Sequence, residues 1–140
     1  LRRARAAAHN IIPTTTGAAT ATTDVIPELK GLLDGISLRV PTITGSLTDF
    51  TFLVGKTTSV QEVNAVLSEE SKSDRWKGIM AVTNEPLVSS DIIGRRESSI
   101  IDLALTKVID SNLVKIFSWY DNEWGYANRL VETVIDIANV

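Results

Sequence analysis

The segment Leu113–Arg129, LVKIFSWYDNEWGYANR, decides the fold of the C-terminal part of this chain. Its first half, Leu113–Trp119, is an apolar run of strand length, and an amphipathic helical pattern follows it. Asp121–Glu123 therefore lies where a strand ends and a helix begins, a place where backbone N–H groups are free to bind. Asp121 or Asn122 is suited to be the N-cap of this helix.

Two interpretations of Asn122 follow from this position. The residue either belongs to a cap surrounded by core aromatic side chains, or it presents a fixed side-chain amide to a planar ligand. In the second case Tyr126 lies one helical turn later on the same face. The local sequence leaves both interpretations open.

Composition limits the class of protein. The chain has 140 residues, of which 44% are hydrophobic and 22% charged, with a net charge of −3, as in one ordinary soluble domain. It has neither a run of eighteen apolar residues nor a signal-peptide pattern, so we expect no membrane partner. The mildly acidic balance gives no support for nucleic-acid binding. The chain starts at Leu1 within an Arg/Ala-rich turn, and we interpret it as a piece of a longer protein.

Cysteine and histidine usage bears on metal sites and compartment. The chain has no cysteine and one histidine, His9, which excludes disulfides, thiolate ligands and a histidine-rich metal site within it. We therefore predict no metal site, and we take the cytoplasm as the default compartment.

The N-terminal part carries two features that suit an anion. Arg2–Ala8 favours a helical turn, whose arginines either form a solvated basic face or bind phosphate through their guanidinium groups. In Thr14–Ala21 a threonine cap and small residues begin a helix whose first N–H groups are open to an anion, and Gly17 allows close approach to the backbone. An ordinary capped helix explains the same pattern.

Arg39 is a further candidate for binding an anion. Ile36–Pro41 alternates apolar and polar residues, which predicts a strand with Arg39 on its polar face. The side chain is either an ordinary surface arginine or a charge directed into a cleft.

The order of elements predicts the fold class. Strands in succession with segregated helices indicate an α+β fold, with a mixed, largely antiparallel sheet covered by helices on one face. No Gly-x-Gly-x-x-Gly dinucleotide-binding unit is present. Besides the elements above, the patterns predict strands at Gly45–Val54, Ile79–Val82, Leu87–Ile93, Ser98–Leu105 and Lys107–Asp110, a helix from Ser59 to about Ser71 with a Ser59/Glu62 capping box, and a final helix at about Asn122–Ala138.

Eight motifs in register resemble the carboxy-terminal part of phosphorylating glyceraldehyde-3-phosphate dehydrogenase, over essentially all 140 residues. They are LRRARAAA at Leu1–Ala8, NIIPTTTGAA at Asn10–Ala19, PELKG at Pro27–Gly31, LRVPT at Leu38–Thr42, EVN at Glu62–Asn64, KGI at Lys77–Ile79, EPLVS at Glu85–Ser89 and WYDNEWGY at Trp119–Tyr126.

The resemblance implies an oxidoreductase of glycolysis. The family oxidises glyceraldehyde 3-phosphate with NAD and inorganic phosphate to 1,3-bisphosphoglycerate, and it forms homotetramers. Four residues of this chain match the family's phosphate-binding positions, and two match the residues that contact the nicotinamide ring and its carboxamide. The phosphate-binding positions are Arg3, Thr16, Gly17 and Arg39, and the nicotinamide contacts are Asn122 and Tyr126.

The chain departs from the family in lacking the nucleophile. The family's catalytic cysteine and histidine lie upstream of the region that this chain resembles, as does the Rossmann domain, so no residue here is predicted to be catalytic. The resemblance implies that residues 1–140 form a partial catalytic domain with an incomplete sheet. It also implies that the final helix, about 122–138, packs on the NAD-binding domain upstream, and that the chain alone is inactive.

Two alternative functions stay open. One is erythrose-4-phosphate dehydrogenase, which shares much of the Arg-Val-Pro and Asp-Asn-Glu-Trp-Gly surroundings. The other is a non-catalytic phosphate-binding or assembly module. The resemblance favours NAD as cofactor, and the choice between NAD and NADP rests with the upstream nucleotide-binding domain.

Overall fold

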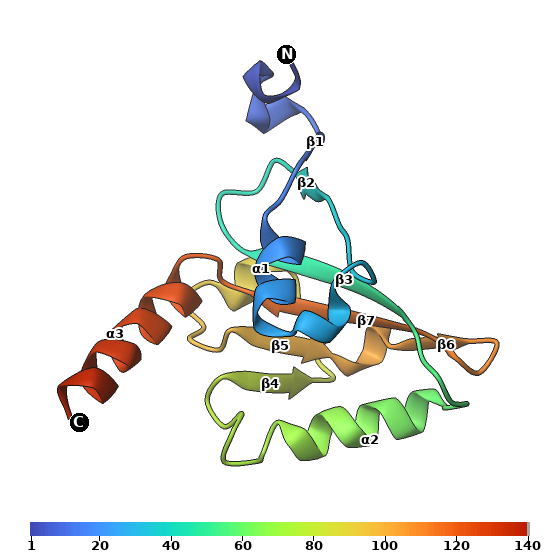
Figure 1. Ribbon diagram of the computed structural model, residues 1–140. Coiled ribbons are helices and arrows are strands. Elements are labelled where there is room, and N and C mark those ends of the chain that lie inside the picture. The colour runs from blue at the N-terminus through green and yellow to red at the C-terminus, as the bar shows by residue number, and fades with distance from the viewer. Residues whose placement is uncertain (140) are drawn as a thin grey trace. The chain divides into compact units, whose positions relative to one another are not determined.

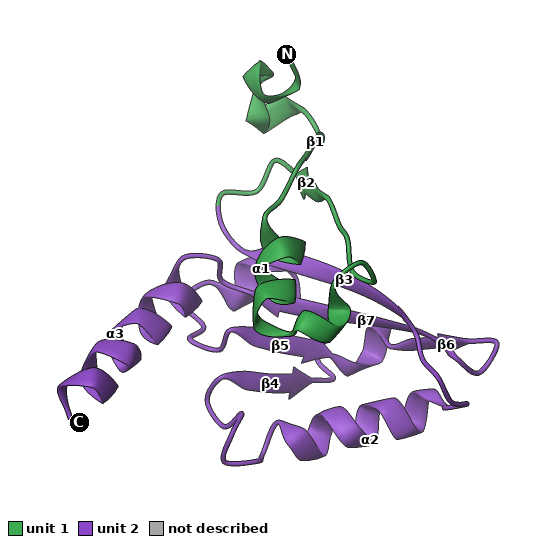
Figure 2. Ribbon diagram, viewed as in Figure 1, with its two compact units in different colours: residues 1–43 green, residues 44–140 purple. Residues whose placement is uncertain are grey.

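The computed structural model describes residues 1–139 and divides the chain into two compact units (Figures 1 and 2). The first unit is Leu1–Ile43, and the second begins at Thr44 and includes the rest of the described chain. Val140, the last residue of the predicted domain, lies outside the described residues.

The first unit is built around a small antiparallel sheet. Strand β1 (Ile12–Thr14) pairs with β2 (Ser37–Arg39), and helix α1 (Ala18–Val25) lies between them in sequence. Ile12 is the buried apolar residue of this unit. The structure confirms the strand predicted around Arg39. The helical turn predicted over Arg2–Ala8 is present as two 3₁₀ turns, Arg2–Ala4 and Ala7–His9, with Pro27–Leu29 forming a third.

The second unit contains a five-stranded sheet in the order β3-β7-β5-β4, with β6 also paired to β7. Only the β4–β5 pair is parallel, which confirms the predicted mixed, largely antiparallel sheet. The predicted α+β class is confirmed as well. The strands are β3 (Ser46–Leu53), β4 (Met80–Thr83), β5 (Ser99–Asp102), β6 (Lys107–Ile109) and β7 (Leu113–Tyr120).

Strand β7 pairs with three of the other strands of the sheet, β3, β5 and β6. It pairs along its whole length with β3, from Ser46↔Tyr120 to Leu53↔Leu113. The turn from β6 into β7 places Asp110 and Ser111 at φ values of 49° and 61°. A short polar side chain tolerates this left-handed conformation better than an apolar one does, so the sequence here suits a tight turn.

Two helices belong to the second unit. Helix α2 (Val60–Glu70) runs beside β4 (Figure 1), and its predicted capping box is present, because Ser59 Oγ accepts from the Glu62 N–H while Glu62 Oε2 accepts from the Ser59 N–H. Helix α3 (Trp124–Ala138) follows β7 and projects away from the sheet (Figure 1). It begins two residues later than the predicted start at Asn122.

The strand predicted over Leu87–Ile93 is wrong. Residues Ser89–Ile92 form a 3₁₀ turn, because the Asp91 carboxylate accepts a hydrogen bond from the Val88 N–H at 2.8 Å. Short polar side chains that bind nearby backbone in this way favour turns over strands. The extended run predicted over Ser98–Leu105 likewise ends at Asp102, and Leu103–Leu105 is a 3₁₀ turn.

The core of the second unit includes side chains on both faces of the sheet, because the consecutive β5 residues Ile100 and Ile101 are both buried. Its buried apolar side chains are Ile92, Ile100, Ile101, Leu103 and Val114. Residues 1–139 include no helix that is both long enough and apolar enough to cross a membrane.

Candidate phosphate and nicotinamide sites

Arg3 and Arg39 come together on consecutive threonines. Arg39 on β2 donates from Nε to Thr14 Oγ1 at 3.2 Å. Arg3 donates from Nη2 to Thr15 Oγ1 at 3.0 Å and to the Thr15 carbonyl at 3.4 Å. Because Ile12 pairs with Arg39 in the two-stranded sheet, Thr14 lies diagonally beside Arg39 on the same face. The sheet register places Arg39 beside Thr14, and the N-terminal turn brings Arg3 to Thr15, so two arginines 36 positions apart in sequence bind the same short segment.

These side chains line a pocket of about 280 Å³ in the first unit. Its lining residues are Arg3, Arg5, Ala7, Ile12, Thr14 and Arg39. Guanidinium groups match the geometry of phosphate oxygens, and threonine hydroxyls can donate to them. The pocket therefore has the charge and the donors that a phosphate group needs.

Thr16 and Gly17 lie at the start of α1 and are not among the residues that line this pocket. Gly17 is the N-cap, and the Thr16 hydroxyl oxygen accepts from the Ala18 N–H at 3.2 Å. A Cβ added at Gly17 would meet no atom within 4 Å, so the packing of the described residues does not require glycine there. Gly17 is exposed, whereas the Ala18 N–H, one of the first N–H groups of α1, is already bound to the Thr16 hydroxyl.

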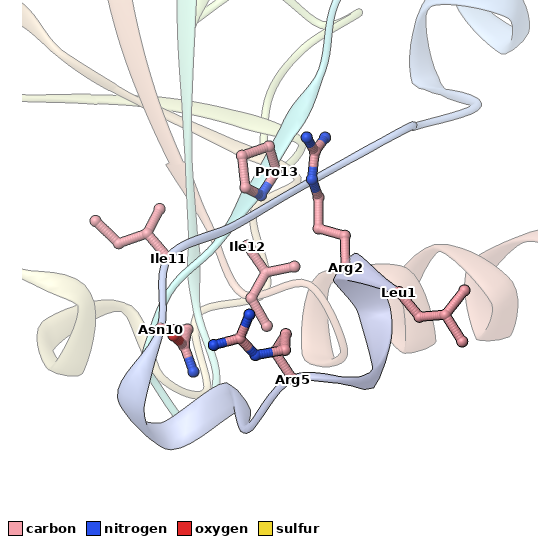
Figure 3. Close-up of a pocket in the computed structure, with 7 residues that line it drawn as sticks. All are labelled: Leu1, Arg2, Arg5, Asn10, Ile11, Ile12 and Pro13. Carbon is pink, nitrogen blue, oxygen red and sulfur yellow. The ribbon is translucent and has the colours of Figure 1, made fainter.

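A second pocket, of about 270 Å³, adjoins the first and shares Arg5 and Ile12 with it. Figure 3 shows its lining: Arg2, in the first 3₁₀ turn, and Arg5, just after that turn, face the extended segment Asn10–Pro13. None of the predicted phosphate residues lines it. The arginines of the N-terminal turn are thus divided between two pockets, with Arg3 in one and Arg2 in the other.

Asn122 is held by the turn that precedes β3. Its side-chain oxygen accepts from the Gly45 N–H at 3.0 Å and from the Ser46 hydroxyl at 3.3 Å. Since both lone pairs of Oδ1 are engaged, the Nδ2 amide is the group available to a ligand. An amide donor is what the carbonyl of a nicotinamide carboxamide requires, so the residue fits this group.

The N-cap position of α3 is Glu123, and the side chain that binds the N–H groups at the start of this helix is that of Asp121. Its buried carboxylate accepts from the N–H groups of Gly94, Trp124 and Glu123 at 2.9, 2.8 and 2.9 Å. Hydrogen bonds from the Gly94 N–H, and then from those of Trp124 and Glu123, favour the charged form and hold the pKa of Asp121 below its ordinary value. Neither predicted residue is therefore the N-cap itself: Asp121 supplies the capping hydrogen bonds from two positions earlier, and Asn122 lies in the turn just before the helix.

Tyr126 lies in the first turn of α3 and is 70% exposed. The neighbouring Gly125 is buried, and a Cβ added there would lie 3.4 Å from the Glu97 carbonyl oxygen. Close packing of α3 on this loop fixes the helix start, while Tyr126 stays accessible to a planar ligand.

Sequence reasoning missed four residues of these sites. Arg5 and Thr14 line the pocket of Arg3 and Arg39. The Thr14–Thr16 run was itself a signal, but which of its members faces a ligand depends on strand register. Gly45 and Ser46 bind Asn122 across 77 and 76 positions of sequence, and no local pattern connects them. The described residues contain no cluster of three or more His, Cys, Asp or Glu side chains that could hold a metal ion.

Comparison with known proteins shows the family to which the chain belongs. A family model described as glyceraldehyde 3-phosphate dehydrogenase, C-terminal domain, matches residues 1–122. Glyceraldehyde-3-phosphate dehydrogenase of Mycobacterium leprae is 58% identical over 134 residues, which are 96% of this chain and 39% of that protein. Glyceraldehyde-3-phosphate dehydrogenase 2 of Streptomyces avermitilis is 52% identical over 139 residues, or 99% of this chain and 41% of that protein.

The similarity extends beyond these two relatives. The glyceraldehyde-3-phosphate dehydrogenase of Zymomonas mobilis is 49% identical over 138 residues. The chain spans about two fifths of the length of the curated relatives that it matches. With a family model covering most of its residues, the chain belongs to the glyceraldehyde 3-phosphate dehydrogenase family and corresponds to its C-terminal domain.

Proposed function

We propose that this chain forms most of the catalytic domain of a longer, NAD-dependent phosphorylating glyceraldehyde-3-phosphate dehydrogenase. In that enzyme it supplies the phosphate-binding residues Arg3, Thr16, Gly17 and Arg39 and the nicotinamide contacts Asn122 and Tyr126. The substrates are glyceraldehyde 3-phosphate and inorganic phosphate. The enzyme acts in the cytoplasm as a homotetramer.

The observation that carries this proposal is the convergence of Arg3 and Arg39 on Thr14 and Thr15. Both substrates carry a phosphate group with two negative charges, and each needs charged, directional donors to be held. Charge-assisted hydrogen bonds of this kind are each worth about 1.5–3 kcal/mol. Three arginines line the pocket, so its positive charge suits a phosphate group.

The role of this chain in the reaction is to bind and orient. The arginines hold the phosphate groups in place, which converts an encounter in solution into a reaction between positioned groups. Asn122 Nδ2 would donate to the nicotinamide carboxamide, and Tyr126 would contact the ring. When bound, the nicotinamide supplies the acceptor for the hydride of the aldehyde.

The nucleophile comes from outside these residues. The chain has no cysteine, whereas the reaction of this family proceeds through a cysteine thioester. We therefore expect the 140 residues alone to have no dehydrogenase activity. They supply the binding sites that a cysteine in the upstream part of the enzyme uses.

Helix α3 supports the expected contact with an upstream domain. Its apolar side chains stay half or more exposed within the described residues: Leu130, Val131, Val134, Ile135 and Ile137. An apolar stripe of this size on a surface helix is a typical docking face. We propose that the NAD-binding domain of the full-length enzyme covers it.

The aldehyde preference of the full-length enzyme tests the proposed function. Initial rates of NADH formation are measured with glyceraldehyde 3-phosphate and with erythrose 4-phosphate, each with and without inorganic phosphate. We expect glyceraldehyde 3-phosphate to be the better substrate and its turnover to depend on phosphate. Preference for the erythrose phosphate, with no effect of inorganic phosphate, would show that the alternative dehydrogenase is correct.

A further inference from the structure

We propose that Gly45 and Ser46 are positioning residues that fix the orientation of the Asn122 side-chain amide, so that the enzyme binds the nicotinamide carboxamide through its carbonyl oxygen. This inference rests on the proposed function, since it assumes that Asn122 contacts the cofactor. It adds two residues to the site and selects which half of the carboxamide is bound.

The orientation follows from the chemistry of the donors. The Gly45 backbone N–H can only donate, so the Asn122 atom that lies 3.0 Å from it is the oxygen and not the nitrogen. The Ser46 hydroxyl donates to the same oxygen at 3.3 Å. An amide oxygen has two lone pairs, and both are now engaged. Asn122 therefore offers a ligand its Nδ2 donor and no acceptor.

The position of Gly45 is itself restricted. Its φ is +91°, a conformation that residues with a Cβ rarely adopt. A Cβ there would lie 3.1 Å from the Ser89 carbonyl oxygen and 3.3 Å from Ile92 Cδ1, and Ile92 is fully buried in the core. The direction of the Gly45 N–H is thus set by packing against a rigid part of the fold.

Ser46 is held just as firmly. It is the first residue of β3 and pairs with Tyr120 at the end of β7, two residues before Asn122. The ladder between the two strands therefore fixes the distance between the Ser46 hydroxyl and the Asn122 amide. A preorganised amide of this kind loses little conformational freedom when a ligand binds.

The experiment uses the full-length enzyme with four single variants: Asn122→Ala, Ser46→Ala, Ser46→Thr and Thr48→Val. We expect Asn122→Ala to raise the KM for NAD about tenfold, and Ser46→Ala to raise it roughly threefold to tenfold without changing the KM for phosphate. Ser46→Thr keeps a hydroxyl and restores the wild-type value. Thr48→Val removes a hydroxyl from the same strand and leaves the KM for NAD unchanged.

The outcomes separate this inference from the proposed function. If Asn122→Ala raises the KM for NAD while Ser46→Ala behaves like Thr48→Val, the positioning role is wrong and the cofactor contact stands. If Asn122→Ala has no effect, the cofactor contact itself is wrong and both proposals fail.

A cofactor analogue tests the amide orientation directly through Asn122. The 3-acetylpyridine analogue of NAD keeps the carbonyl of the carboxamide and lacks its N–H₂ group. With Nδ2 as the donor, Asn122→Ala should raise the KM values for NAD and for the analogue by the same factor. A rise in the KM for NAD alone, with no rise for the analogue, would mean that Asn122 accepts a hydrogen bond, and would overturn the inference.

Discussion

Arg39 Nε lies 3.2 Å from Thr14 Oγ1, joining the end of β2 to the end of β1. This contact places a guanidinium group beside a run of threonine hydroxyls. It turns two weak sequence signals, an arginine on a short strand and a threonine-rich turn, into one candidate phosphate site.

We predict that Arg39→Ala weakens phosphate recognition strongly and that Arg39→Lys weakens it less. Lysine keeps the charge but loses the planar fork that matches phosphate oxygens. In the full-length enzyme the KM for the phosphorylated aldehyde or for inorganic phosphate should rise about tenfold to a hundredfold for the alanine variant, as expected for losing a charge-assisted contact. Steady-state kinetics measure both values. Arg75→Ala, whose guanidinium lies over the Trp76 ring, is the control and should leave both unchanged.

Removing the Asp121 carboxylate should destabilise the second unit. Asp121→Ala leaves three backbone N–H groups without their acceptor, and the loss should be about 1–2 kcal/mol in the free energy of unfolding at pH 7. Urea denaturation followed by tryptophan fluorescence measures this value. An unchanged unfolding midpoint would contradict the role of Asp121 in capping α3.

The same carboxylate predicts an acid dependence of stability. Hydrogen bonds to its charged form hold the pKa of Asp121 below its ordinary value in the folded chain. Its stabilising effect is therefore complete above the unfolded pKa of about 3.9 and is lost as the pH falls through the lower folded value. Between pH 5 and strongly acidic pH, wild-type protein should lose more stability than Asp121→Asn, which has no carboxylate to protonate. An equal loss of stability in the wild-type protein and in Asp121→Asn would show that other groups dominate acid unfolding.

The capping box of α2 should affect stability without affecting activity. Ser59→Ala removes the acceptor of the Glu62 N–H and should cost about 1 kcal/mol. Ser59 is not among the residues proposed to bind phosphate or cofactor, so the KM values of the full-length enzyme should stay at the wild-type level. Thermal unfolding and kinetics of the same preparation test both halves of this prediction.

Helix α3 should behave differently in the isolated chain and in the full-length enzyme. Val134→Lys places a charge on the exposed apolar stripe. In the isolated chain the free energy of unfolding should change by less than about 0.5 kcal/mol. In the full-length enzyme the same change would bury a charge against the upstream domain, and the thermal midpoint should fall by several degrees. Asp136→Lys introduces the same residue at a polar position of the helix and is the control. Equal effects in both forms would contradict the docking of α3.

The fold was predictable where the pattern is local. The capping box at Ser59 and Glu62 and the apolar run that became β7 depend on neighbouring residues, and both are confirmed. The segment Leu87–Ile93 was mispredicted because its apolar residues suit a strand, whereas the hydrogen bond between Asp91 and Val88 favours a turn. Side-chain to backbone bonds of this kind compete with strand pairing, and residue type alone does not show which prevails.

The candidate sites were predictable only in part, for a similar reason. Local patterns made Arg39 and Asn122 candidates but left their roles open, and the family resemblance then implied a role for each. Asn122 is oriented by Gly45 and Ser46, which lie at the start of β3 and far from Asn122 in sequence. Only the strand register brings them together. In the same way, Arg5 and Thr14 line one pocket only because the fold brings the N-terminal turns to β1 and β2.

The most direct test of the proposed phosphate site compares two neighbouring arginines. Arg3 lines the same pocket as Arg39, whereas Arg2 lines the adjoining one. Arg3→Ala and Arg2→Ala remove the same charge one residue apart, but Arg3 also donates to Thr15 and lines the pocket that contains Arg39. In the full-length enzyme, Arg3→Ala should raise the KM for inorganic phosphate or for the phosphorylated aldehyde at least about tenfold, and Arg2→Ala less than about twofold. Equal changes in the two variants would contradict the assignment of this pocket as the phosphate site.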